Sequence, residues 1–266
     1  MGFLNDITLG QYYPGNSILH QLDPRSKLIS SLFFMTSLLL SNKLSLILLL
    51  GGMCIFSIYF AKLPVKIISK NLKPFFWLFL ITFIIHLLTT KGKTIFGVPF
   101  LDLKITEQGL INGATYSIRL AFLIIFAALL TLTTAPIELT DSLERLFSPL
   151  KRFNIPVHEF TLMMSLSLRF IPILIQEAER IKNAQLSRGA SLEGSLLQRV
   201  KNIIPMILPL FISAFRRAEE LAVAMEARHY ISGEGRTSYR QLVFKRGDFG
   251  LLIFSGAFLG GILLFR

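Results

Sequence analysis

The sequence predicts an all-α polytopic membrane protein, with about five transmembrane helices and long amphipathic helices on the cytoplasmic side. Of its 266 residues, 52% are apolar and only 17% are charged, whereas soluble domains are about 25% charged. The mean hydropathy is +0.59. Several apolar stretches also approach the length that crosses a bilayer as a helix. This apolar content excludes a disordered chain, and the single cysteine, Cys54, excludes a disulfide scaffold.

Five apolar stretches are the expected spans, because about 17 to 20 residues cross the hydrocarbon core as a helix. They cover residues 28–40, 44–60, 74–90, 114–134 and 250–265. The first two stretches are separated by three residues only, so they form either a tight hairpin or one bent span.

The basic residues predict the orientation. With the N-terminus inside, the inside segments hold 22 Lys and Arg and the outside loops hold four. Cytoplasmic loops carry such an excess, so we expect a multi-pass plasma-membrane protein with its N-terminus in the cytoplasm and its C-terminus outside. The net charge of +12 therefore belongs to these loops and does not indicate nucleic acid. Four of the basic residues are predicted to face anionic lipid; they are Lys62, Lys66, Lys70 and Lys73.

The segment 137–247 is too long for a simple loop and too charged for further spans. The predicted organisation is therefore four spans in residues 1–136, a helical cytoplasmic-side region in 137–247 and a last span in 248–266. A capping-box pattern at 140–144 predicts a helix start.

Two long amphipathic helices are expected within this region, at residues 158–188 and 196–228. Apolar residues recur in both at helical spacing. Each helix is apolar early and charged late, so we expect it to begin against the membrane and end in water. Prolines are expected to kink both helices; they are Pro172, Pro205 and Pro209.

The ends of these two helices form an internal repeat at an offset of 40 residues. Residues 178–189 align without gaps on 218–229, with Arg188 matching Arg228. We interpret these ends as two equivalent docking tips, because a small residue followed by Arg allows close approach and offers forked donors to a carboxylate. Two alternatives stay open. The likeness can come from shared composition, and each Arg can simply complement the helix dipole.

The sequence lacks the residue patterns that indicate a metal site, ATP binding or a self-contained pump. The four histidines are scattered and have no zinc-ligand spacing, and no P-loop pattern for ATP occurs. The spans almost lack carboxylates, which argues against a self-contained pump. Arg119 lies within a span and is either a functional charge or a snorkelling side chain, and His86 is expected to be a structural hydrogen-bonder. Two small-residue patterns, 109–113 and 256–260, predict close helix packing.

The N-terminal residues 9–28, LGQYYPGNSILHQLDPRSKL, resemble the signature of the transmembrane T component of energy-coupling factor transporters. The two tips, SRG at 187–189 and ARH at 227–229, resemble that family's paired Ala-Arg-Gly motifs. The EQGL run at 107–110 is similar to the family's entry into its fourth span. The likeness covers nearly the whole chain.

The resemblance implies an L-shaped, non-catalytic subunit that holds a substrate-specific membrane subunit (the S component) and two ATP-binding-cassette ATPases. The complex imports vitamins or transition-metal ions, and ATP and magnesium bind to the partners, not to this chain. The implied ATPase contacts are Ser187, Arg188, Gly189, Ala227, Arg228 and His229. The implied signature residues of structural importance are Asp23, Pro24, Arg25 and Lys27. The tips depart from the family at Ser187, which replaces Ala, and at His229, which replaces Gly.

The apolar faces of the two long helices are the expected platform for the S component. These faces contain Ile171, Leu174, Ile175, Leu208, Phe211 and Phe215. ATP-driven closure of the ATPases would move the tips, and the long helices would transmit that motion to the platform.

Three alternatives stay open at this stage. One is a dedicated cobalt or nickel T component in place of a shared vitamin module. Another is a membrane enzyme that uses His86 and Arg119, although it would lack a nucleophile and a metal cluster. The third is a membrane anchor for a complex without a transport role.

Overall fold

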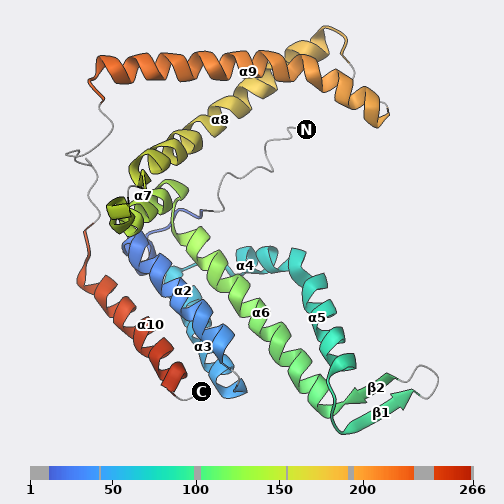
Figure 1. Cartoon of the computed structure of the whole chain (residues 1–266). Coiled ribbons are helices and arrows are strands. Elements are labelled where there is room, and N and C mark those ends of the chain that lie inside the picture. Colours follow the sequence, from blue (N-terminus) through green and yellow to red (C-terminus); the bar gives the residue numbers. More distant parts are fainter. Residues whose placement is uncertain are drawn as a thin grey trace. The chain divides into compact units, whose positions relative to one another are not determined.

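The computed structural model describes residues 12–41, 43–98, 103–153, 155–190, 195–230 and 243–264. Within these ranges the chain is almost entirely helical, as predicted (Figure 1). The elements are α1 (Ile18–Gln21), α2 (Pro24–Leu40), α3 (Leu44–Ala61), α4 (Val65–Leu72), η1 (Lys73–Phe75), α5 (Phe76–Thr89), β1 (Thr94–Val98), β2 (Leu103–Thr106), α6 (Glu107–Thr133), α7 (Pro136–Phe147), η2 (Ser148–Phe153), α8 (Val157–Ser187), α9 (Leu196–Ala227) and α10 (Arg246–Leu264). The antiparallel pair β1–β2 was not predicted from the sequence.

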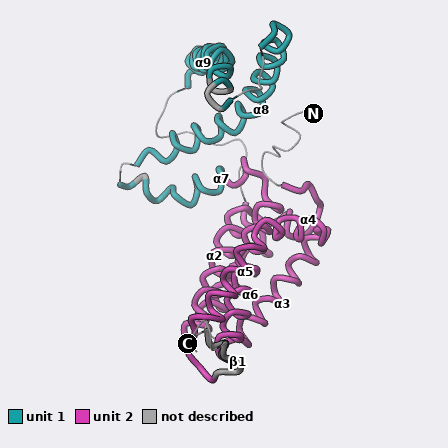
Figure 2. Tube along the Cα trace, turned by 90° about the vertical axis from the view of Figure 1, so that its right-hand side faces the viewer, with its two compact units in different colours: residues 1–9, 140–240 teal, residues 10–139, 241–266 magenta. Residues whose placement is uncertain are grey.

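Contacts between residues divide the chain into two compact units (Figure 2). Unit 1 comprises Met1–Leu9 and Thr140–Arg240, and unit 2 comprises Gly10–Leu139 and Gln241–Arg266. Unit 1 therefore contains the long helices α8 and α9, and unit 2 contains α1 to α6 and α10.

The core of unit 2 forms around α6, which contacts α2, α3, α4 and α5. The rings of Phe34 on α2 and Phe126 on α6 stack with their centroids 5.4 Å apart. α10 packs along α2, so a helix near the N-terminus lies beside the last described helix of the chain. Fully buried apolar side chains of this core are Leu38, Ile47, Leu50, Cys54 and Leu132.

Glycines of α6 allow α5 to approach closely, as one of the two small-residue patterns predicted. A Cβ at Gly113 would lie 3.0 Å from the carbonyl oxygen of Phe83, and one at Gly109 would lie 2.9 Å from that of Leu87. Side chains at these positions would push the two helices apart. In the second pattern a Cβ at Gly256 would lie 3.7 Å from the ring of Phe33 on α2, an ordinary contact, whereas Gly260 on α10 faces open space.

Five helical segments among the described residues are long and apolar enough to cross a membrane. They are Leu44–Ala61, Val65–Thr89, Glu107–Thr133, Val157–Ser187 and Arg246–Leu264. Four of them coincide with predicted spans. α2 is separate from α3 and has only 17 residues, so the first two apolar stretches form a hairpin and not one bent span. By length and composition α8 also qualifies, because its first half is apolar.

The long helices of unit 1 match their predicted bounds to one residue at each end. α8 has 31 residues and contains Pro172, whereas α9 has 32 residues and contains Pro205 and Pro209. α9 bends within its first half (Figure 1). The predicted helix start at 140–144 is wrong: α7 begins at Pro136, a residue type that favours the first helical position, so the pattern lies inside the helix.

Candidate functional site

The two predicted tips end their helices in the same way. At the end of α8, the N–H of Ala190 donates to the carbonyl of Gln185, and the N–H of Gly189 donates to that of Leu186. At the end of α9, the N–H of Tyr230 donates to the carbonyl of Met225, and the N–H of His229 donates to that of Glu226. These paired bonds form a Schellman motif, which satisfies the last carbonyls of a helix. The offset of 40 residues is therefore preserved in the backbone bonds.

The same motif requires a left-handed backbone after each arginine. Gly189 has φ of 86° and His229 has φ of 53°. A residue with a Cβ pays about 1–2 kcal/mol for this conformation, so Gly is the natural residue and His229 is strained. The tip with His229 therefore keeps the same paired backbone bonds as the tip with Gly189.

Both arginines are exposed at the ends of their helices. Neither guanidinium makes a hydrogen bond or an ion pair with the described residues, in contrast to Arg180, which lies 3.6 Å from Glu177. The residues before the arginines, Ser187 and Ala227, are exposed as well. Each tip therefore presents a small side chain followed by an arginine that is available to a partner.

The apolar residues predicted as a platform are mostly exposed on α9 and partly buried on α8. Leu208, Phe211 and Phe215 are 64%, 58% and 71% exposed. The rings of Phe211 and Phe215 stack with their centroids 6.3 Å apart. On α8, Ile171 is exposed, whereas Leu174 and Ile175 are half-buried. α9 has no buried residue among those described, so the described residues of unit 1 leave a long apolar surface on α9 uncovered.

The signature residues form a hydrogen-bonded cluster at the start of α2. Asp23 caps the helix by accepting from the backbone N–H of Arg25 at 2.9 Å, and its carboxylate pairs with the Arg25 guanidinium at 2.9 Å. Pro24 occupies the first helical position. Lys27 is buried, and its ammonium donates to the carbonyls of His20 at 3.2 Å and Thr133 at 3.1 Å. Lys27 therefore connects the segment before α2 with the end of α6.

A carboxylate that the sequence analysis did not single out completes this cluster. Asp248, in the first turn of α10, is fully buried. It accepts from the backbone N–H of Asp23 at 2.8 Å, from the hydroxyl of Ser26 at 2.7 Å and from the backbone N–H of Lys245 at 2.7 Å. Two turns further along α10, the hydroxyl of Ser255 donates to that of Ser30 at 3.2 Å. A signal was present in the sequence, since Asp248 is a lone acid directly before an apolar span.

Comparisons with known proteins agree with the family resemblance. A family model described as "Cobalt transport protein" (CbiQ) matches residues 15–239. The energy-coupling factor transporter transmembrane protein EcfT of Bacillus subtilis is 46% identical over 94% of both chains. The EcfT proteins of Heliobacterium modesticaldum and Listeria innocua are 50% and 45% identical over 96% and 98% of both chains.

The chain belongs to the family of transmembrane T components of energy-coupling factor transporters. It is therefore a multi-pass membrane subunit of a transporter, as its apolar helices also indicate. The family match covers the signature residues at the start of α2 in unit 2 and the tips in unit 1.

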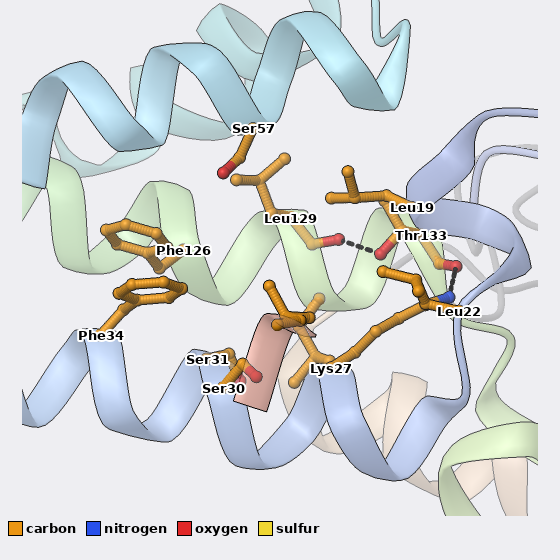
Figure 3. A pocket seen from close by; sticks show the side chains of 12 residues that line it. Leu19, Leu22, Lys27, Ser30, Ser31, Phe34, Ser57, Phe126, Leu129 and Thr133 are labelled. Atoms are coloured by element: carbon orange, nitrogen blue, oxygen red, sulfur yellow. Dashed lines mark hydrogen bonds between the residues drawn. The ribbon is translucent and has the colours of Figure 1, made fainter. Parts of the chain in front are cut away.

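A crevice of about 100 Å³ lies beside the signature cluster of this T component (Figure 3). Leu19, Phe34 and Leu129 contribute apolar walls. Its polar groups are already bonded: Lys27 donates to Thr133, as drawn in Figure 3, and Ser57 donates to the carbonyl of Met53. The crevice therefore offers apolar packing space and no unpaired polar group from these two residues.

The charged residue inside a span, Arg119, supports the end of α2. Its guanidinium donates to the carbonyl of Ser41, the residue that caps α2, and lies 4.9 Å from the ring centroid of Tyr116. Tyr116 in turn stacks on His86 at 4.3 Å. This arrangement accounts for both residues as helix-packing groups. Within the described part of the chain, no three His, Cys, Asp or Glu side chains gather as a metal site.

Proposed function

We propose that this T component couples two ATP-binding-cassette ATPases to a substrate-specific S component during micronutrient uptake, most simply of a vitamin. The observation that carries the proposal is the equivalence of the two tips. Two helices in one unit end in the same Schellman motif, each with an exposed arginine directly before a left-handed residue. Two alike tips on one chain fit two alike partner surfaces.

The chemistry of the tips supports binding to a groove on each ATPase. An arginine presents a rigid fork of donors that matches carboxylates and backbone carbonyls. Ser187 and Ala227 are small enough to let the helix ends enter closely. The sequence contains no P-loop, so the energy for transport has to come from a partner chain.

The apolar surface of α9 supports a membrane-embedded partner. Large exposed apolar patches mark protein or membrane contacts, and on α9 this surface includes Leu208, Phe211 and Phe215. α8 and α9 contact each other. Movement of the tips would therefore be transmitted to an S component that binds this surface and Ile171 of α8. The transmission is mechanical, and catalysis takes place on the ATPases.

The orientation proposed from charge places the start of α2, α4 and the start of α10 at the cytoplasmic face. Figure 1 shows these elements at one end of unit 2 and the hairpin β1–β2 at the opposite end. Arg25, Lys66 and Arg246 belong to the first end, and Lys91 and Lys93 precede the hairpin. The excess of basic residues at the first end supports a cytoplasmic N-terminus and an outside C-terminus.

Purification of the tagged chain from its native membrane, followed by mass spectrometry of its partners, tests the proposal. We expect two ATP-binding-cassette subunits and one or more small apolar membrane proteins. Several different small partners indicate a shared vitamin module. A chain that captures no ATPase at all contradicts the proposal and favours a membrane anchor.

A dedicated metal-ion transporter is the second candidate, because the matching family model is described as a cobalt transport protein. The relatives at 45–50% identity carry the broader energy-coupling factor name, which favours the shared module. A single small partner in the same purification, together with ⁵⁷Co or ⁶³Ni uptake by the complex, would favour the metal-ion reading.

A further inference from the structure

Four lysines surround α4 and form a basic surface at one end of unit 2. We call it the α4 basic surface and define it by Lys62, Lys66, Lys70 and Lys73, all of which are exposed. Lys66 and Lys70 are one helical turn apart on α4, and Lys62 and Lys73 flank the helix at the end of α3 and in η1. Four positive charges thus lie within twelve residues of sequence.

Among the described residues, no carboxylate pairs with this charge. No Asp or Glu occurs in the sequence between Asp23 and Asp102. None of the four ammonium groups donates a hydrogen bond or forms an ion pair with the residues that the structure describes. Like charges repel one another when no counter-charge lies between them. An external anion would therefore stabilise the α4 basic surface.

The other side of α4 is fixed to the membrane-embedded core. Ile68 is buried, Ile67 and Leu72 pack against the core cluster, and α4 contacts α6. α4 joins the apolar helices α3 and α5 through short connections, and Figure 1 shows it turned away from the direction of α5. α4 follows the candidate span Leu44–Ala61 and forms the first part of the candidate span Val65–Thr89. A short helix that is apolar on one side and basic on the other, at the end of a span, is typical of the membrane–water interface.

Apolar residues beside the lysines favour lipid over an acidic protein as the occupant. Val65 and Trp77 are 73% and 70% exposed, and Phe76 is exposed beside Trp77. Tryptophan is enriched at the level of the lipid headgroups, and lysine side chains reach from this depth to the phosphates. We propose that the α4 basic surface binds the phosphate headgroups of anionic phospholipids and concentrates them around α4.

Trp77 allows a direct test, because it is the only tryptophan in the chain. The full chain is reconstituted in vesicles of equal phosphatidylcholine and phosphatidylglycerol, with bromine on the acyl chains of one lipid or of the other. We expect brominated phosphatidylglycerol to quench Trp77 fluorescence more strongly. The local preference should be about fivefold at low salt, the factor that one lysine near an anionic surface supplies. Added salt should reduce it.

Two variants locate the effect. K66Q/K70Q should abolish the preference, whereas the matched pair K91Q/K93Q, which removes two exposed lysines at the other end of unit 2, should retain it. Equal quenching by the two brominated lipids in the wild-type chain overturns the proposal and leaves the surface to an acidic protein. A full preference in K66Q/K70Q overturns it as well. The assay contains no ATPase, so its outcome is independent of the proposed coupling function.

Discussion

A buried carboxylate, Asp248, holds the first turn of α10 against the first turn of α2. Its oxygens accept hydrogen bonds from two backbone N–H groups and from Ser26. Two turns into α10, Ser255 bonds Ser30 and extends the same contact. Hydrogen bonds to a charged group contribute about 1.5–3 kcal/mol each, so this side chain adds to the apolar packing that holds α10 against α2.

We predict that D248N destabilises the chain by about 1–3 kcal/mol, because the amide retains only one acceptor oxygen and leaves a buried donor unsatisfied. Thermal unfolding of the purified chain in detergent measures this as a lower Tm. E220Q, which removes an exposed carboxylate on α9, serves as the control. An unchanged Tm in D248N would show that the bonds of Asp248 contribute nothing net to stability.

At the residue scale, the family resemblance singled out Asp23, Arg25 and Lys27 without their contacts. Their spacing carries the family likeness, but their partners lie up to 225 positions away in the chain, as with the bond between Asp23 and Asp248. The sequence also showed a departure from the family pattern at His229, where Gly is expected. The backbone absorbs the change, because the Schellman bonds form at both ends at the cost of strain at His229.

At the element scale, the sequence predicts the length and bounds of α8 and α9 but not the exposure of their apolar faces. Their length and bounds follow from helical periodicity and from the polar residues that end them, which is why the sequence predicted them closely. Their exposure does not follow from periodicity. An apolar stripe has the same pattern whether it packs on the same chain, on lipid or on a partner. The hairpin β1–β2 was missed because its strands are only five and four residues long.

We predict that L174D and F211D each release the S component from the purified complex while both ATPases remain bound. A charge placed in a packed apolar contact has no partner there, and we expect a loss of about 30-fold in affinity, the effect of a typical hot-spot residue. The S component retained on the tagged chain is quantified by mass spectrometry.

V223D is the matched control for the platform, because Val223 is an exposed apolar residue nearer the tip of α9. It should retain the S component. Equal retention in L174D, F211D and V223D would place the S component elsewhere on the chain.

At the scale of the whole molecule, the tips and the apolar core belong to different compact units. Unit 1 carries the tips and the apolar surface of α9, and unit 2 carries the signature cluster and the α4 basic surface. Composition and charge predicted the membrane class and the helical fold, because both depend on properties summed over many residues. The pairing of helices within unit 2 was not predictable, since contacts such as that of α10 with α2 join distant parts of the sequence.

The central claim is that Arg188 and Arg228 each hold one ATPase, and capture of ATPases by the double variant R188A/R228A tests it most directly. Removing an arginine that is buried in a partner costs about 2–5 kcal/mol, or about 30-fold or more in affinity. We expect the purified double variant to lose both ATPases and to keep the S component. R180A/R216A removes one exposed arginine from each of the same two helices and should keep both. Wild-type amounts of ATPase on R188A/R228A would contradict the account.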